Sequence, residues 1–280
     1  MKKITTLLFS SVPFFLAIGI QFVAVYYLLF IASVFLFNIA PAIQGKIYTE
    51  EDLFILASDM NFNTIASIIF SVSCITVFAI WYYKSCGGNF KINLKKDFHP
   101  YEILGLVLLV PGSQFMSSIV TSMISLAFPN WLEDYMELIE NAGLSGEVPL
   151  LMMIYSVCLA PIGEELIFRG VTYRIARRAF PFWIANIIQA FLFGVFHMNP
   201  LQGCYTFILG LFMGYICEKG VSLYHAIFFH FLFNLWGTTA SQWLTLTSPE
   251  LQGLLVIIGT IVGLTGGFHF FNLGTRIKRT

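Results

Sequence analysis

Long apolar runs separated by short polar segments dominate the chain. A helix needs about 20 apolar residues to cross the hydrocarbon core of a bilayer. The first run extends from about Leu7 to Ala40, and seven more follow at roughly 62–83, 101–127, 148–178, 182–197, 200–218, 221–243 and 251–273. The pattern predicts an all-α polytopic membrane protein with eight transmembrane helices, forming a single transmembrane domain over residues 1–280 with a functional core at about 148–243.

A secretory signal peptide is the rival interpretation of the first run, because Ala40-Pro41-Ala42 loosely resembles a cleavage site. The apolar part of a signal peptide is only about 7–15 residues long, however, and the run here is about twice that. We therefore expect a retained first span. The longer spans are expected to tilt or to project beyond the bilayer.

Composition supports the membrane assignment and excludes other classes. The chain is 58% hydrophobic and 11% charged, whereas soluble domains contain about 25% charged residues. Almost the whole length is needed for spans, so no soluble domain fits. The net charge is zero and no basic cluster of the kind that binds nucleic acid is present.

Charged residues are sorted between alternate loops, which predicts the orientation in the membrane. One set of loops contains Lys2, Lys3, Lys84, Lys91, Lys95, Lys96, Arg174, Arg177, Arg178, Lys219, Arg276, Lys278 and Arg279. The other set has Lys46 as its one basic residue and most of the acids. We therefore expect cytoplasmic N- and C-termini. The segment 131–141 is amphipathic and is expected on the outer membrane surface or as a solvated loop helix.

The segment Ala160 to Gly170 carries three charged residues in an otherwise apolar span. Each costs at least ~2.5 kcal/mol at membrane depth, so such residues indicate a functional site. Glu165 and Arg169 are four residues apart, which predicts an ion pair on one helical face. Glu164 points about 100° away and is left free to act as a general base. A buried pair that only orients helices is the alternative interpretation.

Two later spans add polar groups at a similar depth. Phe193 and His197 close the fifth span and are four residues apart, as are His230 and Asn234 in the seventh. At 1.5 Å per residue, Glu164 and His230 lie about 15 Å and about 14 Å from the inner boundary, and His197 lies about 22 Å from it. These groups can meet in one layer if the fourth, fifth and seventh spans pack together. His225 projects from another face and is expected at the inner boundary.

The combination Glu164-Glu165-xxx-Arg169, Phe193-xxx-His197 and His230-xxx-Asn234 resembles the three motifs of the CPBP family. This family of intramembrane proteases, also called the Abi family, includes CAAX prenyl endopeptidases and bacterial bacteriocin-processing or immunity proteins. The resemblance covers about residues 155–240, and every motif position matches. It implies an eight-helix membrane fold that hydrolyses a peptide bond in a cavity open to the membrane.

The resemblance also implies catalytic roles for six residues. Glu164 and His197 would hold and deprotonate the attacking water, Glu165 and Arg169 would support the geometry, and His230 and Asn234 would stabilise the oxyanion. Glu164, His197 and His230 are also a two-histidine, one-carboxylate set suited to Zn²⁺. Activation of the water by the metal and by glutamate alone both remain open, and we favour slightly the mechanism without a tightly held metal.

Two other function classes fit the same sequence. A bacteriocin-immunity or scaffold protein would use the polar cluster for binding alone. A transporter of protons or small ions is less favoured, because no internal repeat is present. The expected partners are the lipid bilayer and a peptide or membrane-protein substrate, with no nucleic acid. The short sorted loops suit a bacterial plasma membrane.

Overall fold

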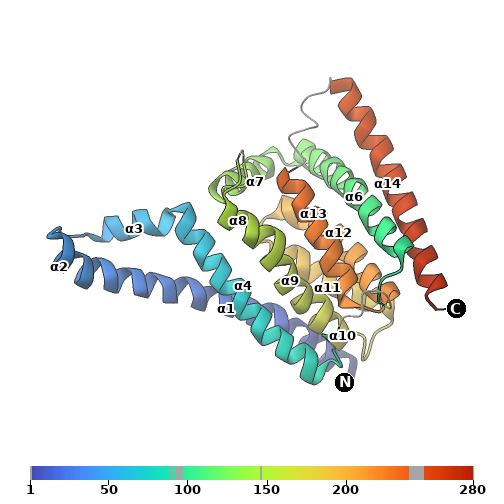
Figure 1. The fold of residues 1–280 in the computed structure, drawn as a ribbon, viewed down its shortest axis with the longest axis horizontal. Helices are drawn as coiled ribbons and strands as arrows, with labels where there is room; N and C mark the ends of the chain where they lie inside the picture. The colour runs from blue at the N-terminus through green and yellow to red at the C-terminus, as the bar shows by residue number, and fades with distance from the viewer. Residues whose placement is uncertain (1, 89, 92–96, 146, 240–248, 280) are drawn as a thin grey trace.

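The computed structural model describes residues 2–88, 90–91, 97–145, 147–239 and 249–279, and every regular element within these ranges is a helix. This confirms the predicted all-α class. Figure 1 shows α1 (Lys2–Val34) and α4 (Met60–Ser85) as a wing on one side of the molecule. The pair α6 (Pro100–Ala127) and α14 (Pro249–Ile277) forms the opposite side, and the helices of residues 150–239 lie between them.

Six helical stretches in the described part of the chain are long and apolar enough to cross a membrane. They are Lys3–Gln44, Met60–Ser85, Pro100–Ala127, Leu150–Ala176, Pro200–Gly220 and Leu251–Ile277. The chain is thus a multi-pass membrane protein. The fifth predicted span is the shorter helix α11 (Phe182–Phe196), and the seventh is α13 (Leu223–Thr239), whose predicted end at 240–243 lies outside the described residues. Eight spans with cytoplasmic termini therefore stay a prediction.

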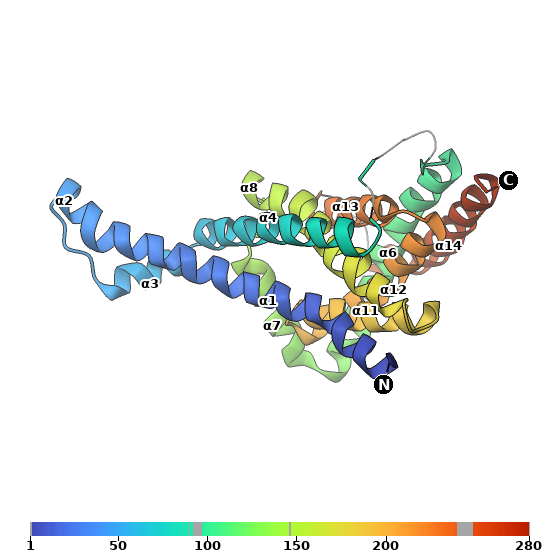
Figure 2. The same cartoon turned by 90° about the horizontal axis from the view of Figure 1, so that it is seen from below.

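The first helix is longer than the sequence pattern predicts. It continues from α1 through η1 (Phe35–Ile39) into α2 (Ala40–Gln44), so its apolar stretch has 42 residues. At 1.5 Å per residue this is about 63 Å, twice the hydrocarbon thickness of about 30 Å. The far half of the wing extends away from the helical body in both views (Figure 2). α3 (Glu50–Ser58) leads back to α4. At its N-terminus the Asp52 carboxylate accepts a hydrogen bond from the backbone N–H of Thr49, which lowers the pKa of Asp52.

The fourth predicted span is one helix built of five pieces. They are α8 (Leu150–Ile154), η2 (Tyr155–Leu159), α9 (Ala160–Glu165), η3 (Leu166–Thr172) and α10 (Tyr173–Ala176). Both η1 and η2 are π-helical and end just before an Ala-Pro pair, at Pro41 and Pro161. A proline lacks the N–H of the regular helical ladder and its ring crowds the preceding turn, which favours a wider turn there. The sequence thus places a π-turn about one helical turn before the acidic pair.

Small residues let α6 and α14 approach closely. A Cβ added to Gly263 would come within 2.6 Å of the Cα of Gly112 on α6. Membrane helices associate through such close backbone contacts. One hydrophobic cluster joins buried residues of helices from α1 to α14, among them Phe14, Phe168 and Phe271. A single domain over residues 1–280 stays a prediction.

The hairpin of α11 and α12 (Pro200–Gly220) is held by polar groups at its centre. Asn186 donates to the carbonyl of Leu211 at 3.0 Å, and Gln189 donates to that of Gly210 at 2.8 Å. Both amide side chains are fully buried. A Cβ at Gly214 would collide with the Asn186 amide. α11 and α12 therefore form a tight helical hairpin around Pro200. The amphipathic segment forms α7 (Pro129–Asn141), which packs against α6 and α12.

Basic residues gather at one end of the bundle. Arg174 donates to the carbonyl of Cys86 at 3.0 Å, and Arg279 donates to that of Lys219 at 3.0 Å. Lys278 pairs with Glu102 at 2.9 Å, and His225 lies 3.4 Å from the same carboxylate. Glu102 and His225 are fully buried, so His225 is part of the helix packing at the predicted inner boundary. Lys95 and Lys96 lie outside the described residues.

Candidate active site

The acidic pair sits where the broken fourth helix crosses the centre of the protein. Arg169 Nη1 donates to Glu165 Oε1 at 2.9 Å, and neither side chain is exposed to solvent. The pair predicted from the four-residue spacing is therefore present. The guanidinium also lies 4.3 Å from the centre of the Phe193 ring, and its Nη2 is 3.4 Å from the carbonyl of Gly210. Arg169 thus links the acidic helix to α11 and α12.

His230 connects the two carboxylates. Its Nδ1 lies 2.9 Å from Glu165 Oε1, the same oxygen that accepts from Arg169, and its Nε2 lies 3.8 Å from Glu164 Oε2. The first distance is a hydrogen bond, whereas the second is an electrostatic contact. An imidazole between two carboxylates fixes the angle between their side chains. α13 thereby holds the orientation of the acidic pair.

Asn234 is committed to the backbone of the broken helix. Its Nδ2 donates to the carbonyl of Ser156 at 2.8 Å. In a π-turn the N–H partner of that carbonyl would come from residue 161, which is a proline without an N–H. The N–H of Ala160 instead donates to the carbonyl of Tyr155. Asn234 therefore supplies the hydrogen bond that Pro161 withholds.

His197 caps the C-terminus of α11. Its Nδ1 lies 2.8 Å from the carbonyl oxygen of Phe193. A carbonyl only accepts, so Nδ1 carries the proton and, in the neutral ring, Nε2 holds the lone pair. The Phe193 ring packs against both His197 and His230, at centroid distances of 4.9 and 6.0 Å. The four-residue spacing thus gives a contact of ring and imidazole, as expected.

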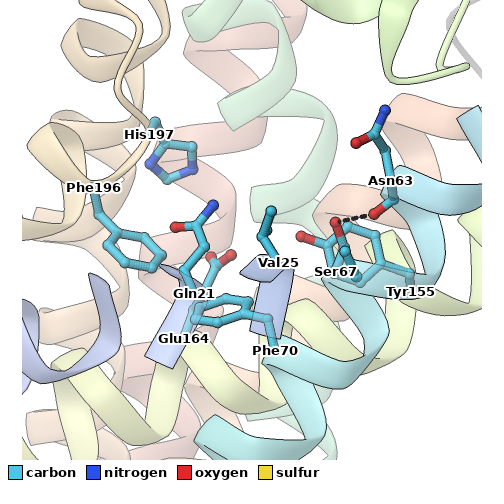
Figure 3. A pocket seen from close by; sticks show the side chains of 10 residues that line it. Gln21, Val25, Asn63, Ser67, Phe70, Tyr155, Glu164, Phe196 and His197 are labelled. Carbon is cyan, nitrogen blue, oxygen red and sulfur yellow. Dashed lines mark hydrogen bonds between the residues drawn. The ribbon is translucent and has the colours of Figure 1, made fainter. Parts of the chain in front are cut away.

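Glu164 and His197 line one pocket of about 280 Å³. Its walls come from α1, α4, η2, α9 and the end of α11. The residues are Gln21, Val25, Asn63, Ala66, Ser67, Phe70, Tyr155, Glu164, Phe196 and His197. Figure 3 shows the Glu164 carboxylate and the His197 ring on the same side of this pocket, with the Tyr155 hydroxyl and the Ser67 side chain across from them. The Glu164 side chain is 17% exposed, which leaves it open to the pocket.

The structure separates the six predicted site residues into two groups. Glu164 and His197 face the pocket. Glu165, Arg169 and His230 form a network behind Glu164, and Asn234 binds the Ser156 carbonyl. His230 and Asn234 were expected to face the oxyanion; in this structure neither lines the pocket, His230 Nδ1 binds Glu165, and one N–H of Asn234 binds the Ser156 carbonyl. The polar residues Gln21, Asn63, Ser67 and Tyr155 were missed, because they come from helices distant in sequence and no motif marks them.

The donor arrangement does not match a three-ligand metal site. No group of three His, Cys, Asp or Glu side chains in the described part of the chain is close enough to hold a metal ion. His230 directs Nδ1 to Glu165, and His197 directs Nδ1 to a backbone carbonyl. The set of Glu164, His197 and His230 does not fit Zn²⁺ as arranged.

The comparison with protein families agrees with the three motifs. Residues 146–236, about a third of the chain, match the family model described as type II CAAX prenyl endopeptidase Rce1-like. This confirms the resemblance to the CPBP family: the chain carries an Rce1-like domain that contains all six predicted site residues. No curated protein and no solved structure gives a significant match.

Proposed function

We propose that the protein is an intramembrane endopeptidase that hydrolyses a peptide bond with a water activated by Glu164 and His197. The observation that carries the proposal is their shared pocket. They are 33 residues apart in sequence on different helices, yet both line one cavity whose walls otherwise lack charged side chains among the described residues. The Rce1-like domain supports the same reaction class.

Glu164 is the general base in this mechanism. Its carboxylate takes a proton from the water as the water oxygen attacks the carbonyl carbon, and a tetrahedral intermediate forms. The intermediate collapses when the C–N bond breaks and Glu164 returns the proton to the leaving amine. General acid–base catalysis of this kind contributes typically ~10²–10⁴-fold in rate.

His197 orients the attacking water. Its Nδ1–H is held by the Phe193 carbonyl, so Nε2 is the nitrogen that accepts a hydrogen bond from the water. Two acceptors, one from Glu164 and one from His197, then align an oxygen lone pair of the water with the carbonyl carbon. Positioning of the reacting groups is a large part of enzymatic rate enhancement.

Glu165, Arg169, His230 and Asn234 are positioning residues in this proposal. Arg169 and His230 both bind Glu165 Oε1, at 2.9 Å each. This network fixes the turn that carries Glu164, and His230 Nε2 adds a contact to Glu164 itself. Asn234 fixes the same helix about two turns earlier, through Ser156. Loss of any of them is expected to misplace the base.

The substrate class follows from the setting of the pocket. The site lies within a helix long and apolar enough to cross a membrane, so the substrate is a membrane-associated peptide or a membrane protein. The sorted charges and short loops support a bacterial plasma membrane as the location. A binding-only immunity or scaffold protein is the competing proposal.

Reconstitution of the purified full-length chain in proteoliposomes tests the proposal. A library of transmembrane and amphipathic peptides is incubated with the wild type, and new termini are detected by mass spectrometry. We expect Glu164→Gln and His197→Ala to lower turnover by at least 100-fold while the thermal midpoint stays unchanged. Glu133→Gln on the exposed face of α7 serves as the matched control and retains full activity. Wild-type turnover by Glu164→Gln would overturn the proposal and favour binding alone.

A further inference from the structure

We propose that Gln21 of α1 is a further catalytic residue, whose side-chain N–H binds the carbonyl oxygen of the scissile peptide bond. The inference rests on the proposed endopeptidase function. It assigns a catalytic group to the first helix, which lies outside the matched domain of residues 146–236.

Gln21 is unusual for its place in α1. Between Pro13 and Val25 it is the one residue with a hydrogen-bonding side chain. Polar side chains at membrane depth are costly and tend to mark functional sites. Within the described part of the chain no hydrogen bond to the Gln21 amide is present. The amide therefore keeps both donors for a ligand.

The helical register turns Gln21 toward the protein. Ala17 and Ala24 are buried, at 0% and 4% exposure, and they lie four residues before and three residues after Gln21. Residues at these spacings share one helical face. α1 packs against α4, η3 and α11. The small side chains of this face let α1 approach the catalytic helices, and the exposed Gln21 lines the pocket.

Gln21 lines the same pocket as the proposed water-activating groups. Figure 3 shows its carboxamide between the Glu164 carboxylate and the His197 ring, and all three residues line the same cavity. A peptide whose carbonyl carbon meets a water held by Glu164 and His197 places its carbonyl oxygen within the same small volume. Gln21 is therefore positioned to donate to that oxygen.

The reaction needs such a donor, and the groups expected to supply it do not line the pocket. Negative charge develops on the carbonyl oxygen as water attacks, and an N–H aimed at it stabilises the transition state. Asn234 Nδ2 donates to Ser156, and His230 Nδ1 binds Glu165. The Gln21 amide is uncommitted and faces the pocket. The Asn63 amide and the Tyr155 hydroxyl are further donors on the wall across from Glu164 and His197 (Figure 3), and the experiment compares Gln21 with Tyr155.

The test compares Gln21→Met with Phe22→Met in the reconstituted full-length protein. Methionine matches the length of glutamine and lacks a donor, and Phe22 is 59% exposed and does not line the pocket. We expect Gln21→Met to lower kcat by roughly 10²-fold with KM changed less than threefold, the effect of losing an oxyanion donor. Its affinity for a peptide aldehyde, which binds as a tetrahedral hydrate, falls in parallel. Phe22→Met behaves as wild type.

Other outcomes distinguish the failures. A kcat of Gln21→Met within threefold of wild type overturns the inference. If Tyr155→Phe then lowers kcat in the same assay, the donor is the tyrosine hydroxyl. If Gln21→Met does not fold, Gln21→Leu, which also lacks a donor, takes its place, and unchanged kcat in that variant overturns the inference as well. Glu164→Gln is measured alongside: full turnover there refutes the endopeptidase function and this inference with it.

Discussion

The buried pair of Arg169 and Glu165 offers a sharp test of how the site is held. Arg169→Met removes a guanidinium that binds Glu165 at 2.9 Å, packs on Phe193 at 4.3 Å and has no solvent exposure. The carboxylate is then left in the interior with His230 as its remaining partner. Breaking a buried pair by removing one partner costs about 3–5 kcal/mol. We expect the free energy of unfolding to fall by that amount.

Removal of both charges is expected to cost much less than the two single changes together. In the double variant Glu165→Leu with Arg169→Met, both charged groups are removed and no charge is left buried without a partner. Replacement of a buried ion pair by apolar residues of similar volume often changes the free energy of unfolding little. His230 Nδ1 loses its acceptor, which costs about 1–3 kcal/mol. The coupling energy between the two sites should therefore be about 3 kcal/mol or more. Turnover stays low in the double variant, because Glu164 has lost its support.

Equilibrium unfolding in detergent micelles measures these energies. The matched control is Arg177→Met, which breaks a pair with Glu218 of 3.2 Å whose side chains are 36% and 35% exposed. Exposed pairs contribute about 0–1 kcal/mol. A loss below 1 kcal/mol for Arg169→Met, or additive single effects, would refute the view that this pair holds the acidic helix.

Three further outcomes are expected. Asn234→Leu leaves the Ser156 carbonyl without its donor and should lower the free energy of unfolding by about 1–3 kcal/mol. Asn38→Leu, which removes an exposed amide, should change this free energy little. Equal effects of the two variants in urea titrations would contradict the prediction. Gly263→Ala places a Cβ 2.6 Å from the Cα of Gly112 on α6 and should destabilise the protein by about 1–3 kcal/mol. Gly266→Ala, whose Cβ would lie 3.9 Å from the Leu108 side chain, should be tolerated. Thermal unfolding compares the two variants. Because the described donors form no three-ligand group, 1,10-phenanthroline should leave peptide cleavage unchanged, and a loss restored by Zn²⁺ would show that a metal is needed.

Local features of the fold and the site were predictable from the sequence. The apolar runs gave the helices because length and composition decide membrane spans. The contact of Glu165 with Arg169 followed from a spacing of four residues within one helix. The Ala-Pro pairs at residues 40–41 and 160–161 were a usable signal for the π-turns, but only the structure shows that Asn234 satisfies the freed carbonyl.

Long-range contacts could not be predicted. Gln21 reaches the pocket because α1 crosses the catalytic helices, and no periodicity within α1 encodes its partner. The same holds for Glu102, His225 and Lys278, which meet from α6, α13 and α14. The length of the first helix was underestimated because proline usually marks a boundary, whereas here the chain widens into a π-turn before Pro41 and continues as α2.

The central claim is that the cavity beside Glu164 and His197 is the water-filled chamber in which the peptide bond is cut. Ser67 lines this cavity on α4, whereas Val72 of the same helix is 49% exposed on the molecular surface and does not line it. In a variant without the five native cysteines, Ser67→Cys and Val72→Cys are treated with a charged methanethiosulfonate reagent while peptide cleavage is followed. The account predicts rapid labelling at residue 67 with loss of cleavage, and neither at residue 72. Complete labelling at residue 67 with cleavage at the unlabelled rate would contradict it.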